Sequence, residues 1–268
     1  MNKSLKATSL ILGVAVGTWL AVICQDGGQR CDQTSFSDNL DYGKPSENVL
    51  VIEREGYALG YNRKWKIAEW VSYRLTRDEV LSNVCDRADL FVKDPLLSSD
   101  FSIPEDYLRS GYDRGHLAPA ADMHWSQEVM AESFYMSNMT PQAPQFNRGI
   151  WKHLEKWVRD MALVETNIVV VTGPIVLAID YYRTIGRNKV IVPSAFYKVV
   201  FDETPPRKMI AFVIPNRGWN EDVSHFAVSV DMVESMTGLD FFKMLPDDKE
   251  NELEAIADFQ SWKKGKER

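Results

Sequence analysis

Residues 112–119 read YDRGHLAP, and four consecutive positions, Asp113 to His116, contain a carboxylate, a permanent cation, a glycine and an imidazole. An imidazole takes up or releases a proton near neutral pH, and a guanidinium holds a phosphate through paired hydrogen bonds. The combination therefore indicates phosphoester chemistry. Taken alone, the match is short enough to be a surface ion pair beside a packed histidine.

A second group of polar residues lies further along the chain, where the sequence reads SNMTPQ (137–142), FNRGIW (146–151) and HLE (153–155). Apolar residues recur there at the spacing of one helix face: Ile150, Trp151, Leu154, Val158 and Met161. A helix should therefore start near Asn147, and its N-terminal amides favour an anion. Glu155 lies about 12 Å further along the axis, so its carboxylate should reach a metal-bound water more readily than the metal itself.

The remaining pattern predicts a mixed α/β (α+β) fold. Segments rich in β-branched and aromatic residues predict strands at 57–61, 69–75, 168–172, 190–201 and 209–215, and helices are expected at 127–135 and 150–163. Hydrophobic residues make up 45% of the chain, which is ample for one core, and no internal repeat is present. A single domain is therefore expected at residues 48–268.

Together the motifs resemble those of the DNA/RNA non-specific endonuclease family. The shared pattern comprises DRGH (113–116), SNxTPQ (137–142), NxGxW (147–151) and LE (154–155), followed in order by VTGP (171–174), IVPSAFYKV (191–199) and TGL (237–239). The resemblance spans roughly residues 48–246. Several separated motifs in one order are much harder to meet by chance than a single motif.

The resemblance implies a central, largely antiparallel sheet flanked by helices, with a ββα-metal active-site element that holds one Mg²⁺ or Mn²⁺ ion. In such a site His116 would be the general base that activates water, and Asn147 would be the protein's direct metal ligand. Glu155 would orient metal-bound waters. Three further residues would bind the phosphate or support the site: Arg114, Arg87 and Asn138.

These residue types suit the chemistry on independent grounds. A neutral amide ligand leaves a divalent ion its full charge for the phosphate. An imidazole with an ordinary pKa of about 6.5 is mostly free base above pH 7, and general-base action raises a reaction rate by about 10²–10⁴-fold. The implied function is a metal-dependent endonuclease that hydrolyses DNA and RNA without sequence or sugar specificity. The alternatives are a phosphodiesterase of narrower substrate range and a non-catalytic nucleic-acid-binding or envelope interaction protein.

Structural explanations also exist for single residues of the pattern. Asn147 is a good helix N-cap, and Asn138 could stabilise a turn before Pro141. Glu155 could pair with Lys152 or Arg159 on a solvated helix face, for about 0.3–0.5 kcal/mol. These explanations would all have to hold together to replace the functional one.

The charge balance speaks against a simple nucleic-acid-binding protein. The chain has 31 Lys and Arg against 38 Asp and Glu, a formal net charge of −7. Because phosphate binding relies on basic residues, these must gather locally. Candidate groups are residues 63–66, Arg148 with Lys152, and residues 183–189.

The N-terminal sequence suggests where in or outside the cell the protein is located. Lys3 and Lys6 precede an apolar stretch at residues 10–24, which is typical of a signal peptide or signal anchor. We therefore expect an exported protein, which is periplasmic, secreted or membrane-anchored facing outside. A mitochondrial presequence is disfavoured because no arginine precedes Arg30. Residues 1–24 would then be the leader and residues 25–47, rich in Asp, Ser, Gly and Gln, a flexible linker.

Three cysteines are few for a disulfide scaffold, although Cys31 could pair with Cys85 in an oxidising compartment. The sequence leaves several properties open: DNA-versus-RNA preference, the physiological metal, a homodimer, an N-terminal membrane anchor and an inhibitor partner.

Overall fold

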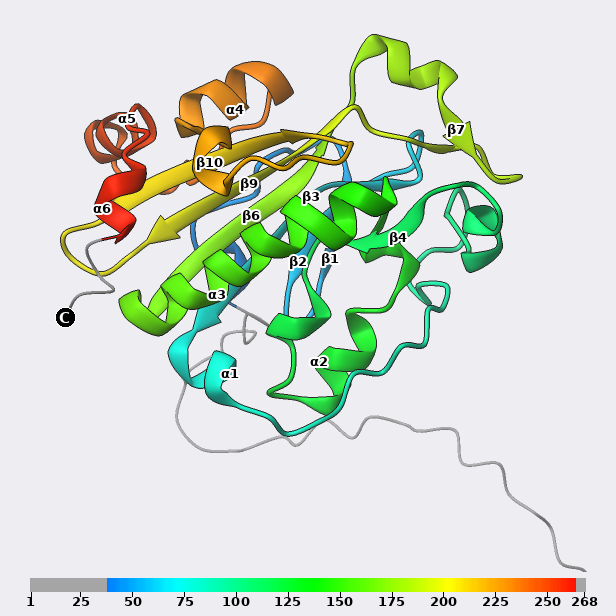
Figure 1. Cartoon of the computed structure of the whole chain (residues 1–268), viewed down its shortest axis with the longest axis horizontal. Coiled ribbons are helices and arrows are strands. Elements are labelled where there is room, and N and C mark those ends of the chain that lie inside the picture. Colours follow the sequence, from blue (N-terminus) through cyan, green and yellow to red (C-terminus); the bar gives the residue numbers. More distant parts are fainter. Residues whose placement is uncertain (1–37, 264–268) are drawn as a thin grey trace, which may run out of the picture. The chain divides into compact units, whose positions relative to one another are not determined.

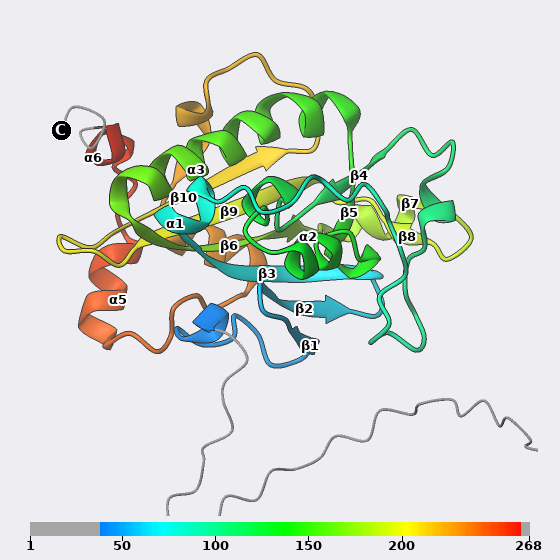
Figure 2. The ribbon, with the colours of Figure 1, turned by 90° about the horizontal axis from the view of Figure 1, so that it is seen from below.

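A seven-stranded antiparallel sheet forms the centre of the structure, a computed structural model that describes residues 38–263. Its strand order is β1-β2-β3-β6-β9-β10-β11. Figure 1 shows β10, β9, β6, β3, β2 and β1 side by side, and Figure 2 shows the same order from below. The strands are β1 (Leu50–Glu53), β2 (Ala58–Asn62), β3 (Ile67–Thr76), β6 (Asn167–Ile175), β9 (Ala195–Asp202), β10 (Lys208–Pro215) and β11 (Ala227–Val228).

Both faces of the sheet are covered by apolar cores, because successive side chains of a strand point to opposite faces. On β9, Val200 belongs to one core and Val199 to the other. The first core contains the apolar face of α3 (Lys152–Glu165), which packs along β3 and β6 (Figure 1). The second core contains α4 (Val230–Thr237), which packs on β10, as does α5 (Asp247–Glu254).

Smaller elements complete the fold. Two short ribbons pair outside the main sheet, β4 (Asp113–His116) with β5 (Met139–Gln142) and β7 (Thr184–Ile185) with β8 (Val190–Ile191). Three further helices are α1 (Arg77–Leu81), α2 (Gln127–Glu132) and α6 (Phe259–Lys263). No helix in the described part of the chain, residues 38–263, is long and apolar enough to cross a membrane.

The predicted helices and strands are present with shifted boundaries. Helical structure begins near Asn147 as expected, but residues Phe146–Trp151 form a π-helical turn in which Gly149 has non-helical angles (φ −107°, ψ −112°). Regular α-helix therefore starts only at Lys152. The strand expected at 190–201 is two strands, β8 and β9, separated by Val192, Pro193 and Ser194.

The segment 38–47 is packed against the sheet, although it falls in the expected flexible linker. Asn39 is buried, donates to the carbonyl oxygen of Glu55 at 3.1 Å and accepts from the amide of Arg74 at 2.9 Å. Tyr42 and Ser46 also bond to residues of the folded body. The linker prediction is therefore wrong for these residues, because buried side-chain hydrogen bonds fix the backbone. The leader, the rest of the linker and Cys31 lie outside the described residues.

Candidate active site

The β4–β5 ribbon places His116 at the edge of a cleft. His116 pairs with Met139 and Asp113 with Gln142 across the ribbon. Gly115 is required between them, because a Cβ at this position would lie 2.1 Å from the side chain of Gln142. The glycine of the DRGH motif therefore allows the two strands to approach.

His116 is held as a neutral base. Its ring lies edge-on to Phe134, 4.9 Å between centroids, and 5.7 Å from Phe91. Burial, followed by the nearby positive charge of Arg87, lowers the pKa of His116 to about 3. Its Nε2 atom has no hydrogen-bond partner among the described residues. The imidazole is thus unprotonated at neutral pH with a nitrogen able to accept a proton.

Asn138 is fully buried and lies behind the histidine, outside the cleft lining. Its Oδ1 accepts from the amide of Ala118 at 2.9 Å, and its Nδ2 donates to the carbonyl oxygens of Ala118 and Ser133 at 2.9 and 2.8 Å. Its backbone oxygen accepts from the amide of Leu117 at 3.0 Å. Asn138 therefore fixes the two residues that follow His116.

Asn147 lies opposite, in the π-helical turn. Its Nδ2 donates to Asp113 Oδ2 at 3.0 Å, and Arg148 donates two hydrogen bonds, of 2.8 and 2.6 Å, to the same carboxylate. Burial raises the pKa of Asp113, but the hydrogen bonds from Arg148 and Asn147 outweigh it and the pKa is lowered overall. Because its amide nitrogen is held in this way, Asn147 has Oδ1 left to bind a cation.

Glu155, on α3, lines the same cleft above a buried lysine. Lys198, on β9, is 0% exposed, and its Nζ has no hydrogen-bond acceptor among the described residues and lies 5.0 Å from the centre of the Trp151 ring. Burial raises the pKa of Glu155, and the charge of Lys198 opposes this rise. The lysine thus favours the ionised carboxylate.

Arg159 also lines the cleft, one helical turn after Glu155. Its Nη1 donates to Asp122 Oδ1 at 2.6 Å, and Tyr73 donates to Asp122 Oδ2 at 3.0 Å. Sequence reasoning gave Arg159 only as a surface partner of Glu155. The i, i+4 spacing from Glu155 was the available signal that both residues share one face.

The remaining predicted arginines reach the cleft from separate segments. The Arg114 guanidinium lies 4.2 Å from the centre of the Phe91 ring, and that of Arg87 lies 4.9 Å from the centre of the Phe134 ring. Stacking on the rings fixes the plane of each guanidinium. Arg87 also pairs with Asp89 at 2.5 Å, and its side chain is 46% exposed. Both cations are therefore available to a phosphate.

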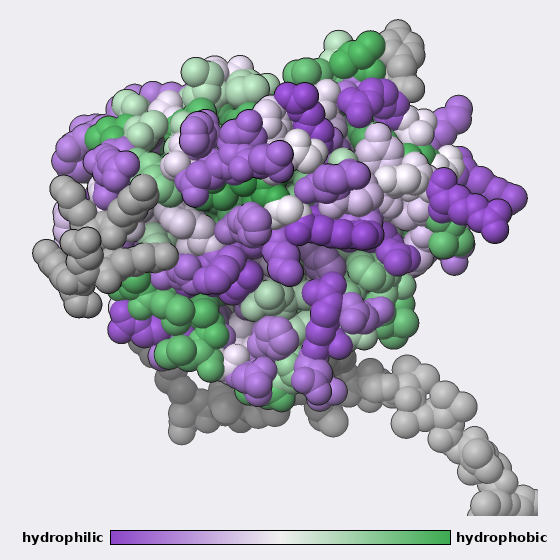
Figure 3. All heavy atoms as spheres, in the orientation of Figure 1, coloured by the Kyte–Doolittle hydropathy of each residue, from purple (hydrophilic) through white to green (hydrophobic). Residues whose placement is uncertain are grey.

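The cleft has a volume of about 290 Å³ and brings together five of the six predicted site residues, Asn138 being the exception. Its lining includes a single carboxylate, that of Glu155. It also includes five basic side chains: Arg87, Arg114, Arg148, Lys152 and Arg159. Hydrophilic side chains form a band across the face that carries α3 and β4 (Figure 3). A locally positive cleft therefore exists on a chain of net charge −7.

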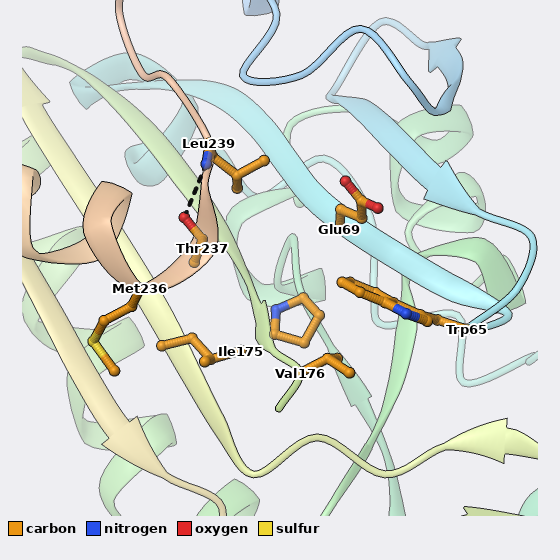
Figure 4. Close-up of a pocket in the computed structure, with 8 residues that line it drawn as sticks. Trp65, Glu69, Ile175, Val176, Met236, Thr237 and Leu239 are labelled. Carbon is orange, nitrogen blue, oxygen red and sulfur yellow. Dashed lines mark hydrogen bonds between the residues drawn. The ribbon is translucent and has the colours of Figure 1, made fainter. Parts of the chain in front are cut away.

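A smaller hollow of about 40 Å³ lies elsewhere, between Trp65, Ile175 and Met236 (Figure 4). It is large enough for only a few waters and contains none of the predicted site residues. It plays no part in the proposed chemistry.

The cleft residues fit a hard divalent ion. Asn147 and Glu155 offer oxygen atoms, the ligand type that Mg²⁺ and Mn²⁺ prefer. Glu155 is a carboxylate whose ionised form is disfavoured by burial, and a bound cation would stabilise that form.

A paired-strand ribbon that carries a histidine, followed by a helical segment that carries asparagine and glutamate over an arginine-lined cleft, defines the ββα-metal class of nucleases. The chain belongs to the DNA/RNA non-specific endonuclease family, whose family model matches residues 36–248.

Named relatives agree with this assignment. The chain is 34% identical over 220 residues to the mitochondrial nuclease EXOG of mouse, covering 76% of this chain and 60% of that protein. It is 35% identical over 252 residues to the mitochondrial nuclease of Saccharomyces cerevisiae, covering 82% and 75%. A crystal structure of the EndoG/EndoGI complex has a TM-score of 0.74 and 36% identity, covering 78% and 91%. The chain therefore spans less than two thirds of the length of the mouse relative.

The comparisons overturn the expectation of export. The similar nucleases of mouse, clawed frog and yeast are named as mitochondrial. The absence of arginine before Arg30 does not exclude a mitochondrial presequence. Lys3 and Lys6 also supply positive charge, and no acidic residue precedes Asp26.

Proposed function

We propose that the chain is a divalent-metal-dependent endonuclease that hydrolyses phosphodiester bonds of DNA and RNA without reading base sequence. The observation that carries the proposal is the neutral imidazole of His116 in the same cleft as Asn147 and Glu155. The geometry favours a hydrolase over a binding protein, because binding alone needs no neutral base among the cations.

In the proposed reaction the neutral imidazole of His116 takes a proton from a water molecule whose oxygen attacks phosphorus. The bond from phosphorus to the 3′-oxygen breaks, and the 3′-oxygen takes a proton from solvent, which leaves a 5′-phosphate. Asn147 Oδ1 would hold a Mg²⁺-type ion, with Glu155 orienting its waters. When bound, that ion supplies positive charge for the phosphate oxygens. Arg87 and Arg114 position the diester and stabilise its developing charge.

The basic lining of the cleft supports nucleic acid as the substrate. Arginine and lysine contact phosphate oxygens, which carry no sequence information. The five basic side chains of the cleft thus suit any strand, DNA or RNA. They also explain how an acidic chain could bind a polyanion.

A nicking assay on supercoiled plasmid and a hydrolysis assay on RNA test the proposal. Chelator should abolish both activities, and added Mg²⁺ should restore them. His116→Ala should lower the rate at least about 10²-fold. His153 is an exposed histidine on α3, and His153→Ala should keep the parental rate. Asn147→Ala should require more metal. Equal rates for His116→Ala and the parent would show that the base is misassigned.

We also propose a mitochondrial address for the chain, by analogy with the named relatives. The N-terminal segment, which contains Lys3 and Lys6 and no acidic residue before Asp26, would then be a targeting segment. Residues 1–37 fused to a fluorescent protein should direct it to mitochondria. A diffuse or secreted signal would contradict this address.

A further inference from the structure

A group of three carboxylates lies between α4 and α5, away from the cleft. Asp231 and Glu234 are three residues apart on α4 and therefore share one helix face. Glu254 is the last residue of α5. One oxygen atom from each side chain lies within 4.8 Å of the others. Both helices pack on β10, so the group bridges two neighbouring elements (Figure 1).

Glu254 is buried without a partner. It is only 4% exposed, and its Oε1 has no hydrogen bond among the described residues. A buried polar atom left unpaired costs about 1–3 kcal/mol, and more when charged. Its position at the C-terminal end of α5 adds the negative end of the helix dipole. Glu254 therefore needs a positive charge or a proton.

The surroundings add negative charge. Glu250, one turn before Glu254, also has a buried oxygen without a partner. Burial, followed by the charges of Glu234, Glu250, Asp231 and Asp240, raises the pKa of Glu254 to about 9.

The two lysines between Glu234 and Glu254 in the sequence bond to other groups. Among residues 38–263, Lys249 bonds to Glu252 and Lys243 to Glu47, and no described ion pair includes Asp231, Glu234 or Glu254. An external cation would compensate this charge.

We propose that Asp231, Glu234 and Glu254 form a second, structural site for a Ca²⁺-type cation that ties α5 to α4. All three donors are carboxylate oxygens, which hard cations prefer, and Ca²⁺–O distances of 2.3–2.6 Å allow ligand oxygens up to about 4.6–5.2 Å apart. The 4.8 Å spread of the group fits this range. Because two ligands come from α4 and one from α5, the bound ion stabilises the packing of both helices.

Thermal unfolding of the full chain, treated with chelator and then titrated with Ca²⁺, tests the site. At a Ca²⁺ concentration about 100-fold above Kd, the parent should gain roughly 5–10 °C in Tm. Glu234→Gln and Glu254→Gln should lose this gain, and both should be at least as stable as the parent without Ca²⁺, because each removes repulsion.

Two controls separate this site from the cleft. Asp248→Asn, an exposed α5 residue outside the group, and Asn147→Ala, in the cleft, should both keep the Ca²⁺-dependent gain. The proposal is overturned if the parent shows no gain, which would mean that Glu254 is simply protonated. It is also overturned if Glu254→Gln keeps the gain or if Asn147→Ala removes it.

Discussion

Asn138 forms a closed pair of hydrogen bonds with the backbone of Ala118, accepting from its amide and donating to its carbonyl oxygen, each at 2.9 Å. Ala118 lies two residues after His116, so a buried amide fixes the chain immediately beyond the proposed base. The strand that carries His116 thus depends on a contact between positions twenty residues apart.

Replacing Asn138 should therefore damage stability and activity together. Asn138→Ala leaves the amide of Ala118 and two carbonyl oxygens without their partner, which should cost about 2–4 kcal/mol. Chemical denaturation measures this loss, and the nicking rate per folded molecule should also fall. Asn220→Ala, an exposed loop residue, serves as control and should change neither. Unchanged stability in Asn138→Ala would contradict the supporting role.

The cleft was largely predictable because its members stand in short ordered motifs. DRGH, NxGxW and LE specify residue types at fixed spacing, and the structure brings them together. Asp122 and Lys198 escaped prediction because their roles arise from packing between distant segments. Lys198 stands in an alternating strand, where a lysine normally faces water, yet α3 covers it. The break at Gly149 depends on backbone angles that the helical spacing of neighbouring residues does not reveal.

His116 should resist protonation well below the usual range for histidine. The Hε1 chemical shift of His116, followed by NMR across a pH series, should show a folded-state pKa far below 6.5, near 3. As the pH falls, His116 takes up a proton in the unfolded chain near pH 6.5 but in the folded chain only near pH 3. His116 should therefore contribute stability that is present above about pH 6.5 and lost as the pH falls toward 3. Titration of His116 near 6.5 would refute its burial.

Gly115→Ala should destabilise the β4–β5 ribbon. The added Cβ would lie 2.1 Å from the buried side chain of Gln142, and overpacking of this kind typically costs about 1–3 kcal/mol. Trimming the neighbour in the double variant Gly115→Ala/Gln142→Ala should recover much of that cost. Thermal melts of both single variants and the double variant form a complete cycle. Additive losses would show that the two side chains do not compete for space.

Arg114→Lys should reduce the cleavage rate on every sequence to a similar extent. Lysine keeps the positive charge but loses the planar fork and the stacking on Phe91. Cleavage-site profiling on a random DNA library should show a general loss with flat base preference. Arg63→Lys, whose Nη1 donates to Ser99 at 3.2 Å outside the cleft lining, should retain the parental rate. A changed base preference without a rate loss would indicate that Arg114 reads bases.

Lys198→Met should separate activity from stability. The lysine is fully buried without a hydrogen-bond acceptor among the described residues, so an apolar side chain of similar length removes the desolvation cost of the ammonium. Burial already raises the pKa of Glu155 to about 7, so this carboxylate can take up a proton when the lysine is lost, and the free energy of unfolding should be unchanged or higher. The charge of Lys198, however, lowers the pKa of Glu155 against the rise caused by burial. Without that charge the pKa of Glu155 rises further, and less of the carboxylate is ionised near pH 7. The rate should therefore fall near pH 7 and recover as the pH is raised.

Lys208→Met is the control and should give the opposite pattern. Lys208 bonds to Glu165 at 2.7 Å, away from the cleft, so its loss should lower the free energy of unfolding and leave the rate per folded molecule at the parental value. Rate profiles against pH, paired with denaturation curves for both variants, measure this separation. An equal rate loss at every pH in Lys198→Met would show that the lysine does not act through the charge of Glu155.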